Sequence, residues 1–187
     1  VNMNKILIKA KSHDVPVLID EAYQGFCNQT YINDLKKFNN LIILRTFSKS
    51  CGLAGLRAGY LVSNEKIINE LDKFKPMYEI NSAACKVLEI LLKKKNFEKK
   101  IVNHVLDGKK YFQNELDKMN LKYLKTFGNF LHVDLGKKKN MIEQKLKNKK
   151  ILTRKGPGVI GYESYLRFTL GPKKEMKKVV RFLKTNV

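Results

Sequence analysis

The sequence contains no tryptophan, four prolines and three cysteines, and its 17 acidic side chains stand against 38 basic ones. It has no run of about 18 or more apolar residues, so we expect no membrane-spanning helix. The first residues lead into no apolar stretch that ends in small residues, which argues against a signal peptide. Cys27, Cys51 and Cys85 are odd in number and lack a CxxC spacing. Such usage is typical of reduced thiols, and we expect a cytoplasmic protein.

The rest of the composition is that of a folded chain with an uneven charge. Hydrophobic residues make up 43% of the 187 positions, which is enough for a sizeable core and excludes a disordered chain. Residues 1–92 carry 12 basic and 9 acidic side chains, whereas residues 93–187 carry 26 and 8. Only five of the bases are arginines, and no basic segment is interleaved with aromatic residues. We therefore do not favour a nucleic-acid partner, which would call for more arginine.

The first part of the chain alternates between helical and strand-like segments. Short apolar runs over residues 15–19, 41–44 and 58–62 predict strands buried on both faces, as in an α/β sheet. Helices are expected to end near residue 12 and to extend from residue 63 or 64 to 74, where Ser63 or Asn64 can cap the first turn. So few strands before a change of pattern indicate the C-terminal part of a longer protein.

After Pro76 the pattern predicts a separate α+β domain. Helical periodicity covers residues 82–95 and 97–120, although Gly108 weakens the second of these helices. A last helix follows Gly171 and Pro172. Its inward-facing residues are expected to be Val179, Val180 and Leu183. Between these helices we expect strands over 121–124, 130–135, 151–153 and 165–170 and a basic helix around 141–146.

Two constellations follow expected strands of the first part, where α/β folds place ligands. The first is Asp20-Glu21-Ala22-Tyr23, in which a half-buried carboxylate requires a partner. The second covers residues 45–60 and reads RTFSKSCGLAGLRAGY. Its hydroxyls and Arg57 around a glycine-rich turn form an anion cradle, and Lys49 at its mouth could act as a nucleophilic amine.

A third constellation covers residues 165–171 and reads YLRFTLG. It places Arg167 on an otherwise apolar strand, where the arginine needs an anionic partner. Arg154, at the end of the preceding expected strand, is a weaker second anion contact. The three histidines are far apart and show no metal-ligand spacing, so we expect no metal site.

The segment over residues 45–60 resembles the lysine region of fold type I pyridoxal-phosphate enzymes, and the Asp-Glu-Ala-Tyr sequence is its usual upstream companion. In particular, the chain is similar to class I/II aminotransferases of the histidinol-phosphate type. Their segments read much like TFSKSCGLAGLRAGY and, near the end, YLRFTLG. The resemblance covers nearly the whole chain as the C-terminal portion of such an enzyme. It implies a mostly parallel three-layer large domain, of which residues 1–80 would be the C-terminal part, and interdomain helices with an α+β small domain over 81–187.

The resemblance also implies roles for individual residues. Lys49 would hold pyridoxal 5′-phosphate as a Schiff base and later move a proton between the substrate Cα and the cofactor C4′. Asp20 would pair with the pyridine nitrogen, which makes the ring an electron sink, and Tyr23 would donate to its phenolic oxygen. The phosphate would be held by Thr46, Ser48 and Arg57. Arg167, and more weakly Arg154, would bind the substrate's carboxylate or phosphate.

The implied function is amino-group transfer to or from a small anionic amino or keto substrate in amino-acid biosynthesis, by a homodimer. The upstream phosphate-binding turn and the ring-stacking aromatic of the family are missing, so this chain alone could be inactive. Three alternatives stay open. The chain could be an inactive remnant, or half of a split enzyme that serves as an interaction module. It could also belong to a decarboxylase of phosphorylated amino acids or, less in keeping with its arginine content, to a basic nucleic-acid-binding protein.

Overall fold

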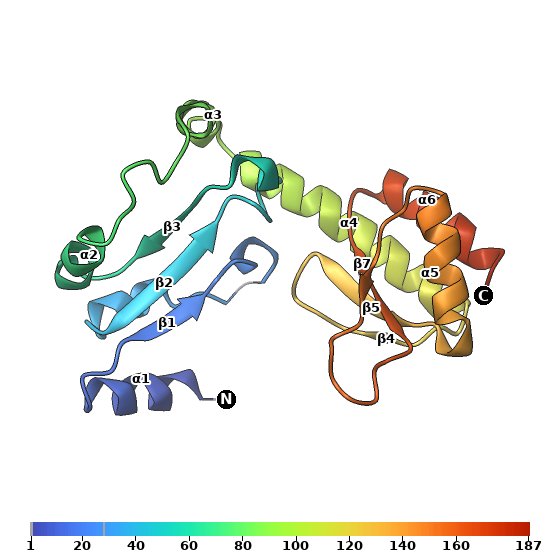
Figure 1. Cartoon of the computed structure of the whole chain (residues 1–187), viewed down its shortest axis with the longest axis horizontal. Coiled ribbons are helices and arrows are strands. Elements are labelled where there is room, and N and C mark those ends of the chain that lie inside the picture. Colours follow the sequence, from blue (N-terminus) through green and yellow to red (C-terminus); the bar gives the residue numbers. More distant parts are fainter. Residues whose placement is uncertain (1, 28) are drawn as a thin grey trace. The chain divides into compact units, whose positions relative to one another are not determined.

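The computed structural model describes residues 2–27 and 29–187. The chain forms two compact units, residues 1–99 and 100–187 (Figure 1). Both combine helices with β-sheet, which confirms the α/β class. The division into domains at residues 80 and 81 concerns the family's large and small domains and stays a prediction. Elements of the first unit are α1 (Met3–Lys11), β1 (Val17–Asp20), η1 (Gln24–Phe26), η2 (Ile32–Lys36), β2 (Leu41–Thr46), η3 (Ala54–Leu56), β3 (Gly59–Val62), α2 (Glu65–Asp72) and α3 (Ser82–Leu92).

The sheet of the first unit has the strand order β1-β2-β3 (Figure 1). Strand β1 runs parallel to β2, whereas β3 is antiparallel to it. Leu41 and Ile43 of β2 are fully buried together with Leu7 of α1, and residues of η2 pack against the same cluster. One face of the sheet is therefore covered by α1 and η2.

The opposite face of the same sheet carries apolar side chains that are partly exposed. Leu18, Leu44 and Leu61 lie on it, with 57%, 38% and 39% of their surface exposed. The prediction that all three strands are buried on both faces is therefore wrong for β1 and β3. Because α1 and η2 pack on the side of Leu41 and Ile43, the face of Leu18 and Leu44 stays partly open, although Ile42 at its centre is buried.

The second unit contains most of α4, which begins in the first unit, and a four-stranded antiparallel sheet of order β4-β5-β7-β6. The predicted inward face of the last helix is confirmed, because Val179, Val180 and Leu183 are buried. Elements of this part are α4 (Phe97–Lys118), β4 (Tyr123–Leu124), β5 (Phe130–Asp134), η4 (Gly136–Lys138), α5 (Lys139–Asn148), β6 (Arg154–Lys155), β7 (Tyr165–Thr169) and α6 (Lys173–Lys184).

One strand of this unit differs from the expectation. Residues 151–153 do not form a strand, and the strand β6 covers Arg154–Lys155 instead. The amide of Ile151 donates to the carbonyl of Leu146, and Lys150 adopts a positive φ of 60°. These features close the end of α5, as is common at helix C-termini. Ile151 therefore completes the helix cap, and Arg154 begins the next strand rather than ending it.

Glu115 of α4 is a buried carboxylate that two lysines hold in its charged form. Lys118 Nζ lies 2.7 Å from its Oε1, and Lys184 Nζ of α6 lies 2.5 Å from its Oε2. Hydrogen bonds from Lys118 and then Lys184 lower the pKa of Glu115 from 4.5 to about 2. Because the folded-state pKa is depressed, this contribution to stability is present above pH 4.5 and lost as the pH falls toward about 2.

We expect Glu115→Gln to lower the urea midpoint at neutral pH and to flatten its fall between pH 4.5 and about 2. Urea unfolding of both proteins across this range measures the effect. The matched control is Glu175→Gln, since Glu175 is an exposed carboxylate of α6 that pairs only with Lys178 among the described residues. If the urea midpoints of wild type and Glu115→Gln fell by the same amount between pH 4.5 and about 2, the stabilising role of the Glu115 ion pairs would be contradicted.

Gly108 lies inside α4, where a glycine ordinarily costs helix stability. A Cβ at this position would collide with the carbonyl oxygen of Gly171, in the connection between β7 and α6. We therefore expect Gly108→Ala to destabilise the chain by about 1–3 kcal/mol through overpacking, although alanine favours the helix by about 1 kcal/mol. Chemical unfolding measures the change in the free energy of unfolding, and a variant more stable than wild type would contradict this close packing.

No helix in the described ranges 2–27 and 29–187 combines the length and apolar character needed to cross a membrane. All three cysteines are free thiols.

Candidate active site

A cavity of about 250 Å³ lies in the first unit at the ends of β1 and β2. Four of the residues predicted to bind the cofactor line it, namely Asp20, Thr46, Ser48 and Arg57. The lining is completed by Ala22, Leu44, Arg45, Ala58 and Gly59. A carboxylate, two hydroxyls and a guanidinium therefore share one opening. This set offers partners for a protonated ring nitrogen and for a phosphate group.

The two parallel strands explain why these side chains meet. Asp20 is the last residue of β1 and Thr46 the last of β2, so both lie at the same edge of the sheet. Asp20 Oδ1 accepts a hydrogen bond of 2.9 Å from the amide of Ala22. Thr46 Oγ1 accepts one of 3.1 Å from the amide of Ser48 and donates to the carbonyl of Ala58. Backbone turns thus hold the two side chains at the cavity.

Arg57 follows η3 in a left-handed backbone conformation, with a φ of 53°. Its Nη1 donates to the carbonyl of Ala54 at 3.1 Å. Strained conformations of residues other than glycine cost of order 1–3 kcal/mol and cluster at functional sites. The chain then turns into β3, where Gly59 lies so close to β2 that a Cβ would sit 2.7 Å from the Arg45 carbonyl oxygen. This approach brings the Arg57 segment against the end of β2.

Lys49 and Tyr23 form a second pair in the same unit. Lys49 Nζ lies 5.7 Å from the centre of the Tyr23 ring, and both residues are partly buried. Tyr23 immediately precedes η1, and Lys49 follows Ser48 in the connection after β2. The sequence thus separates these two residues by 25 intervening positions, and the fold brings them into contact.

The contact between these two segments depends on Gly25. A Cβ at this position would overlap the side chain of Ser50 and lie 2.7 Å from Glu98 Oε1. We expect Gly25→Ala to lower stability by about 1–3 kcal/mol and to loosen the Lys49–Tyr23 contact. Thermal unfolding and proteolysis of the 45–60 connection measure the two effects. Gly55→Ala is the control, since nothing lies within 4 Å of its added Cβ, and equal effects of both variants would contradict the prediction.

A salt bridge that the sequence did not predict, between Glu21 and Arg45, also holds this site together. Glu21, rather than Asp20, is the buried carboxylate of the Asp-Glu-Ala-Tyr segment, with 4% of its side chain exposed. Its Oε2 accepts from Arg45 Nε and Nη2 at 3.0 and 2.9 Å. Its Oε1 accepts from the amide of Tyr31 at 2.6 Å, and Thr30 Oγ1 donates to its Oε2. Such a charge-assisted network fixes the ends of β1 and β2 relative to each other.

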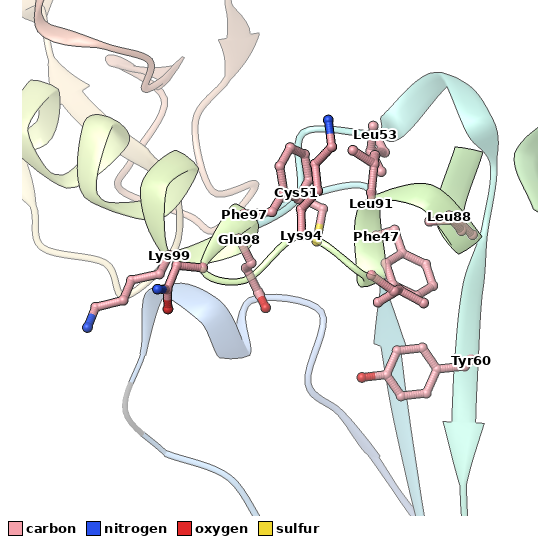
Figure 2. A pocket seen from close by; sticks show the side chains of 12 residues that line it. Phe47, Cys51, Leu53, Tyr60, Leu88, Leu91, Lys94, Phe97, Glu98 and Lys99 are labelled. Carbon is pink, nitrogen blue, oxygen red and sulfur yellow. The ribbon is translucent and has the colours of Figure 1, made fainter. Parts of the chain in front are cut away.

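A larger apolar pocket of about 340 Å³ lies in the same unit, between the β2–β3 connection and the end of α3 (Figure 2). Phe47, Leu53, Tyr60, Leu88 and Leu91 are among the side chains that line it. Figure 2 shows the rings of Phe47 and Tyr60 side by side, with their centres 5.5 Å apart. Charged side chains, Lys94, Glu98 and Lys99, complete one side of the pocket, and none of the residues predicted to bind the cofactor lines it.

Cys51 lies at the wall of this pocket and close to the lysine connection (Figure 2). Burial, and then the charge of Glu98, raise the pKa of its thiol. Since the thiolate is the reactive form, Cys51 is a weak nucleophile at neutral pH. Cys51 therefore serves as a small packing residue at this wall.

The two predicted substrate-binding arginines belong to the second unit. Arg167 lies on β7 directly opposite Arg154 of β6. Arg167 is half-buried, with its guanidinium carbon 5.1 Å from the centre of the Phe130 ring, whereas Arg154 is exposed. Two positive side chains are thus neighbours on one face of this sheet.

Comparison with known proteins extends this picture. Residues 2–183 match the family model for aminotransferase class I and II. Histidinol-phosphate aminotransferase 1 of Carboxydothermus hydrogenoformans is 35% identical over 175 residues, which cover 94% of the chain and 50% of that protein. The histidinol-phosphate aminotransferase of Thermoanaerobacter sp. is 37% identical over 166 residues, which cover 88% of the chain and 46% of that protein.

Solved structures agree in fold. The histidinol-phosphate aminotransferase of Clostridium acetobutylicum superposes with a TM-score of 0.84 at 24% identity and covers 97% of this chain and 57% of its own. L-threonine-O-3-phosphate decarboxylase from Porphyromonas gingivalis superposes with a TM-score of 0.76 at 21% identity and covers 98% of this chain and 57% of its own. The chain spans about half the length of the curated relatives it matches. The match over residues 2–183 nevertheless establishes that the chain belongs to the class I and II aminotransferase family.

Proposed function

We propose that the chain is part of a pyridoxal-phosphate-dependent enzyme of amino-acid biosynthesis that transfers an amino group to or from an anionic substrate of the histidinol-phosphate class. The observation that carries this proposal is the cavity at the ends of β1 and β2, which gathers Asp20, Thr46, Ser48 and Arg57. Its hydroxyls and guanidinium suit a phosphate, and its carboxylate suits a protonated ring nitrogen. The similarity to histidinol-phosphate aminotransferases supports the substrate class.

The proposed roles follow from the chemistry of each side chain. When bound, the cofactor supplies an electron sink for the negative charge that develops at the substrate Cα. Asp20 would accept a hydrogen bond from the ring nitrogen and keep it protonated, and Tyr23 would donate to the phenolic oxygen. Lys49 would hold the cofactor covalently through its Nζ, with loss of water from the aldehyde, and once displaced by the substrate amine it would move a proton between the substrate Cα and C4′ of the cofactor. Thr46, Ser48 and Arg57, which line the same cavity, would hold the phosphate.

Arg167, with Arg154 beside it, binds the carboxylate or phosphate of the substrate in this proposal. A guanidinium offers paired donors in the geometry of such oxyanions. The family's homodimer and the cytoplasmic location stay predictions.

A single-turnover assay tests the reaction type. The chain is loaded with pyridoxal phosphate, histidinol phosphate is added without any keto acid, and pyridoxamine phosphate is quantified after quenching. We expect pyridoxamine phosphate to form in proportion to loaded chain. Release of carbon dioxide from a phosphorylated amino acid, with no pyridoxamine phosphate from histidinol phosphate, would instead support the decarboxylase. The same assay is run with the chain joined to the unmatched half of the Carboxydothermus relative, and absence of product from both would overturn the proposal.

The open sheet face supports a second candidate, a half-enzyme that works by pairing with a complementing chain. Leu18, Leu44 and Leu61 form this face, and a sheet with parallel strands is normally covered on both sides. Binding to the unmatched half of the Carboxydothermus relative is measured with an apolar dye as reporter. We expect the added half to displace the dye from the wild-type chain. The double variant Leu18→Glu, Leu44→Glu should not bind the added half. Dye binding that the added half leaves unchanged would contradict this candidate.

A further inference from the structure

Three residues with basic side chains lie in a row across the second unit's sheet. Strand β7 is flanked by β5 and β6, and Arg167 is paired with His132 on one side and with Arg154 on the other. Directly opposite residues in an antiparallel sheet have neighbouring side chains on the same face, and like charges there are destabilising. The arrangement therefore places up to three positive charges side by side.

Within the described part of the chain, no carboxylate lies within 4.0 Å of either arginine in an ion pair. Asp134, two residues beyond His132 on the same face, accepts from the amide of Gly136 at 3.0 Å and so belongs to its own turn. The β4 residue opposite His132 is the apolar Leu124. The charged groups that face His132 from its neighbouring strands are thus Arg167 and, beyond it, Arg154. The row has a surplus of positive charge.

Two buried polar atoms in this row lack a hydrogen-bond partner among the described residues. They are Nδ1 of His132 and Nε of Arg167. His132 is buried, with 8% of its surface exposed, and the edge of its ring meets Phe130 with ring centres 5.4 Å apart. The Arg167 guanidinium lies over the same Phe130 ring, 5.1 Å from its centre. Buried polar groups are normally satisfied, so this pair of orphaned atoms points to a group that the described residues do not supply.

We infer that His132 is the third member of an oxyanion site with Arg167 and Arg154, and that its protonation strengthens the binding of a carboxylate or phosphate there. This inference rests on the proposed function only for the identity of the physiological ligand. It adds a residue that neither the motif nor the resemblance singled out.

The physical reason is reciprocal coupling between proton and anion. Burial, and then the positive charge of Arg167, lower the pKa of His132, so its imidazole is neutral at neutral pH when the site is empty. A bound oxyanion offsets the charge of Arg167 and accepts a hydrogen bond from a protonated ring. By linkage, an anion that raises the pKa of His132 binds more tightly as the pH falls through that pKa.

Side-chain NMR of the three histidines tests this inference without cofactor. The imidazole signals are titrated between about pH 5 and 8, once in sodium chloride and once in sodium sulfate of equal ionic strength. Sulfate keeps its double negative charge over this pH range, so any pH-dependent change in the signals comes from protonation of the protein. His13 and His104 are exposed and lie outside the row. They serve as internal references for the general electrostatic effect of sulfate on this basic chain.

We expect sulfate to raise the pKa of His132 by about half a unit relative to chloride, whereas the signals of the two reference histidines should respond much less to sulfate. That shift corresponds to about threefold tighter sulfate binding below the pKa than above it. Equal shifts for all three histidines, or none for His132, would overturn the inference. Because cofactor is absent, this result is independent of whether Lys49 links to pyridoxal phosphate.

Substitutions test whether the coupling between sulfate and His132 arises from the row of His132, Arg167 and Arg154. In Arg167→Gln we expect the pKa of His132 to rise in chloride and to become insensitive to sulfate. In His132→Gln sulfate should still bind, but with an affinity that no longer depends on pH, whereas His104→Gln should behave as wild type. If His132→Gln fails to fold, the wild-type titration still decides, since it needs no variant.

Discussion

Lys49→Ala is expected to abolish the visible absorbance band that pyridoxal phosphate gives when linked to a lysine. Lys49 Nζ is the amine proposed to bond to the cofactor aldehyde, and the neighbouring Tyr23 ring lies 5.7 Å from it. Alanine removes the amine while leaving the phosphate-binding side chains in place. We therefore expect cofactor to bind noncovalently and weakly to the variant, with an absorbance spectrum like that of free pyridoxal phosphate.

Two controls separate this effect from general lysine chemistry. Lys49→Arg keeps the positive charge but cannot form the bond, so it should also lose the band. Lys66→Ala removes an exposed lysine of α2 and should keep it. A band that persists in both Lys49 variants would place the reactive lysine elsewhere in this lysine-rich chain.

Arg167→Ala is expected to weaken anionic substrates by about 2–5 kcal/mol, or roughly 30-fold to several thousand-fold in affinity. Arg167 is the half-buried member of the row on β5, β6 and β7, and truncation removes its paired donors. Calorimetric titration with histidinol phosphate measures the loss in a chain that has been checked for cooperative unfolding.

Two controls, a matched ligand and a matched variant, test whether this loss of affinity is specific to the phosphate. Histidinol, which lacks the phosphate, should lose little affinity on Arg167→Ala if this arginine binds the phosphate. Arg181→Ala removes an exposed arginine of α6 and should leave both affinities unchanged. Equal losses for histidinol phosphate and histidinol would contradict phosphate recognition by Arg167, and no loss for either would contradict anion binding altogether.

Much of the fold was predictable because local signals and tertiary packing agree. The apolar run at Leu41 became the buried centre of β2, and Asn64 caps α2 by accepting from the amide of Ile67. The grouping of Asp20 with Thr46 also follows from the rule that parallel strands end at one edge.

Other features depend on contacts between distant segments and could not be found locally. Glu21 became the buried carboxylate because Arg45 of the next strand reaches it, although the scarcity of arginine was a usable signal for Arg45. Gly108 looked like a weak point of a helix, but its lack of a side chain admits the Gly171 carbonyl. His132 gained its significance only from the register of β5 against β7.

The central claim, that this chain builds a pyridoxal-phosphate site around Lys49, is tested most directly by reductive trapping. The purified chain is mixed with pyridoxal phosphate, reduced with borohydride and digested, and the pyridoxyl mass is located by mass spectrometry. We predict selective labelling of the peptide that contains Lys49. The label should be lost in Gly25→Ala if the Lys49 segment needs its contact with the Tyr23 segment. Label spread evenly over the chain's many lysines would contradict the claim.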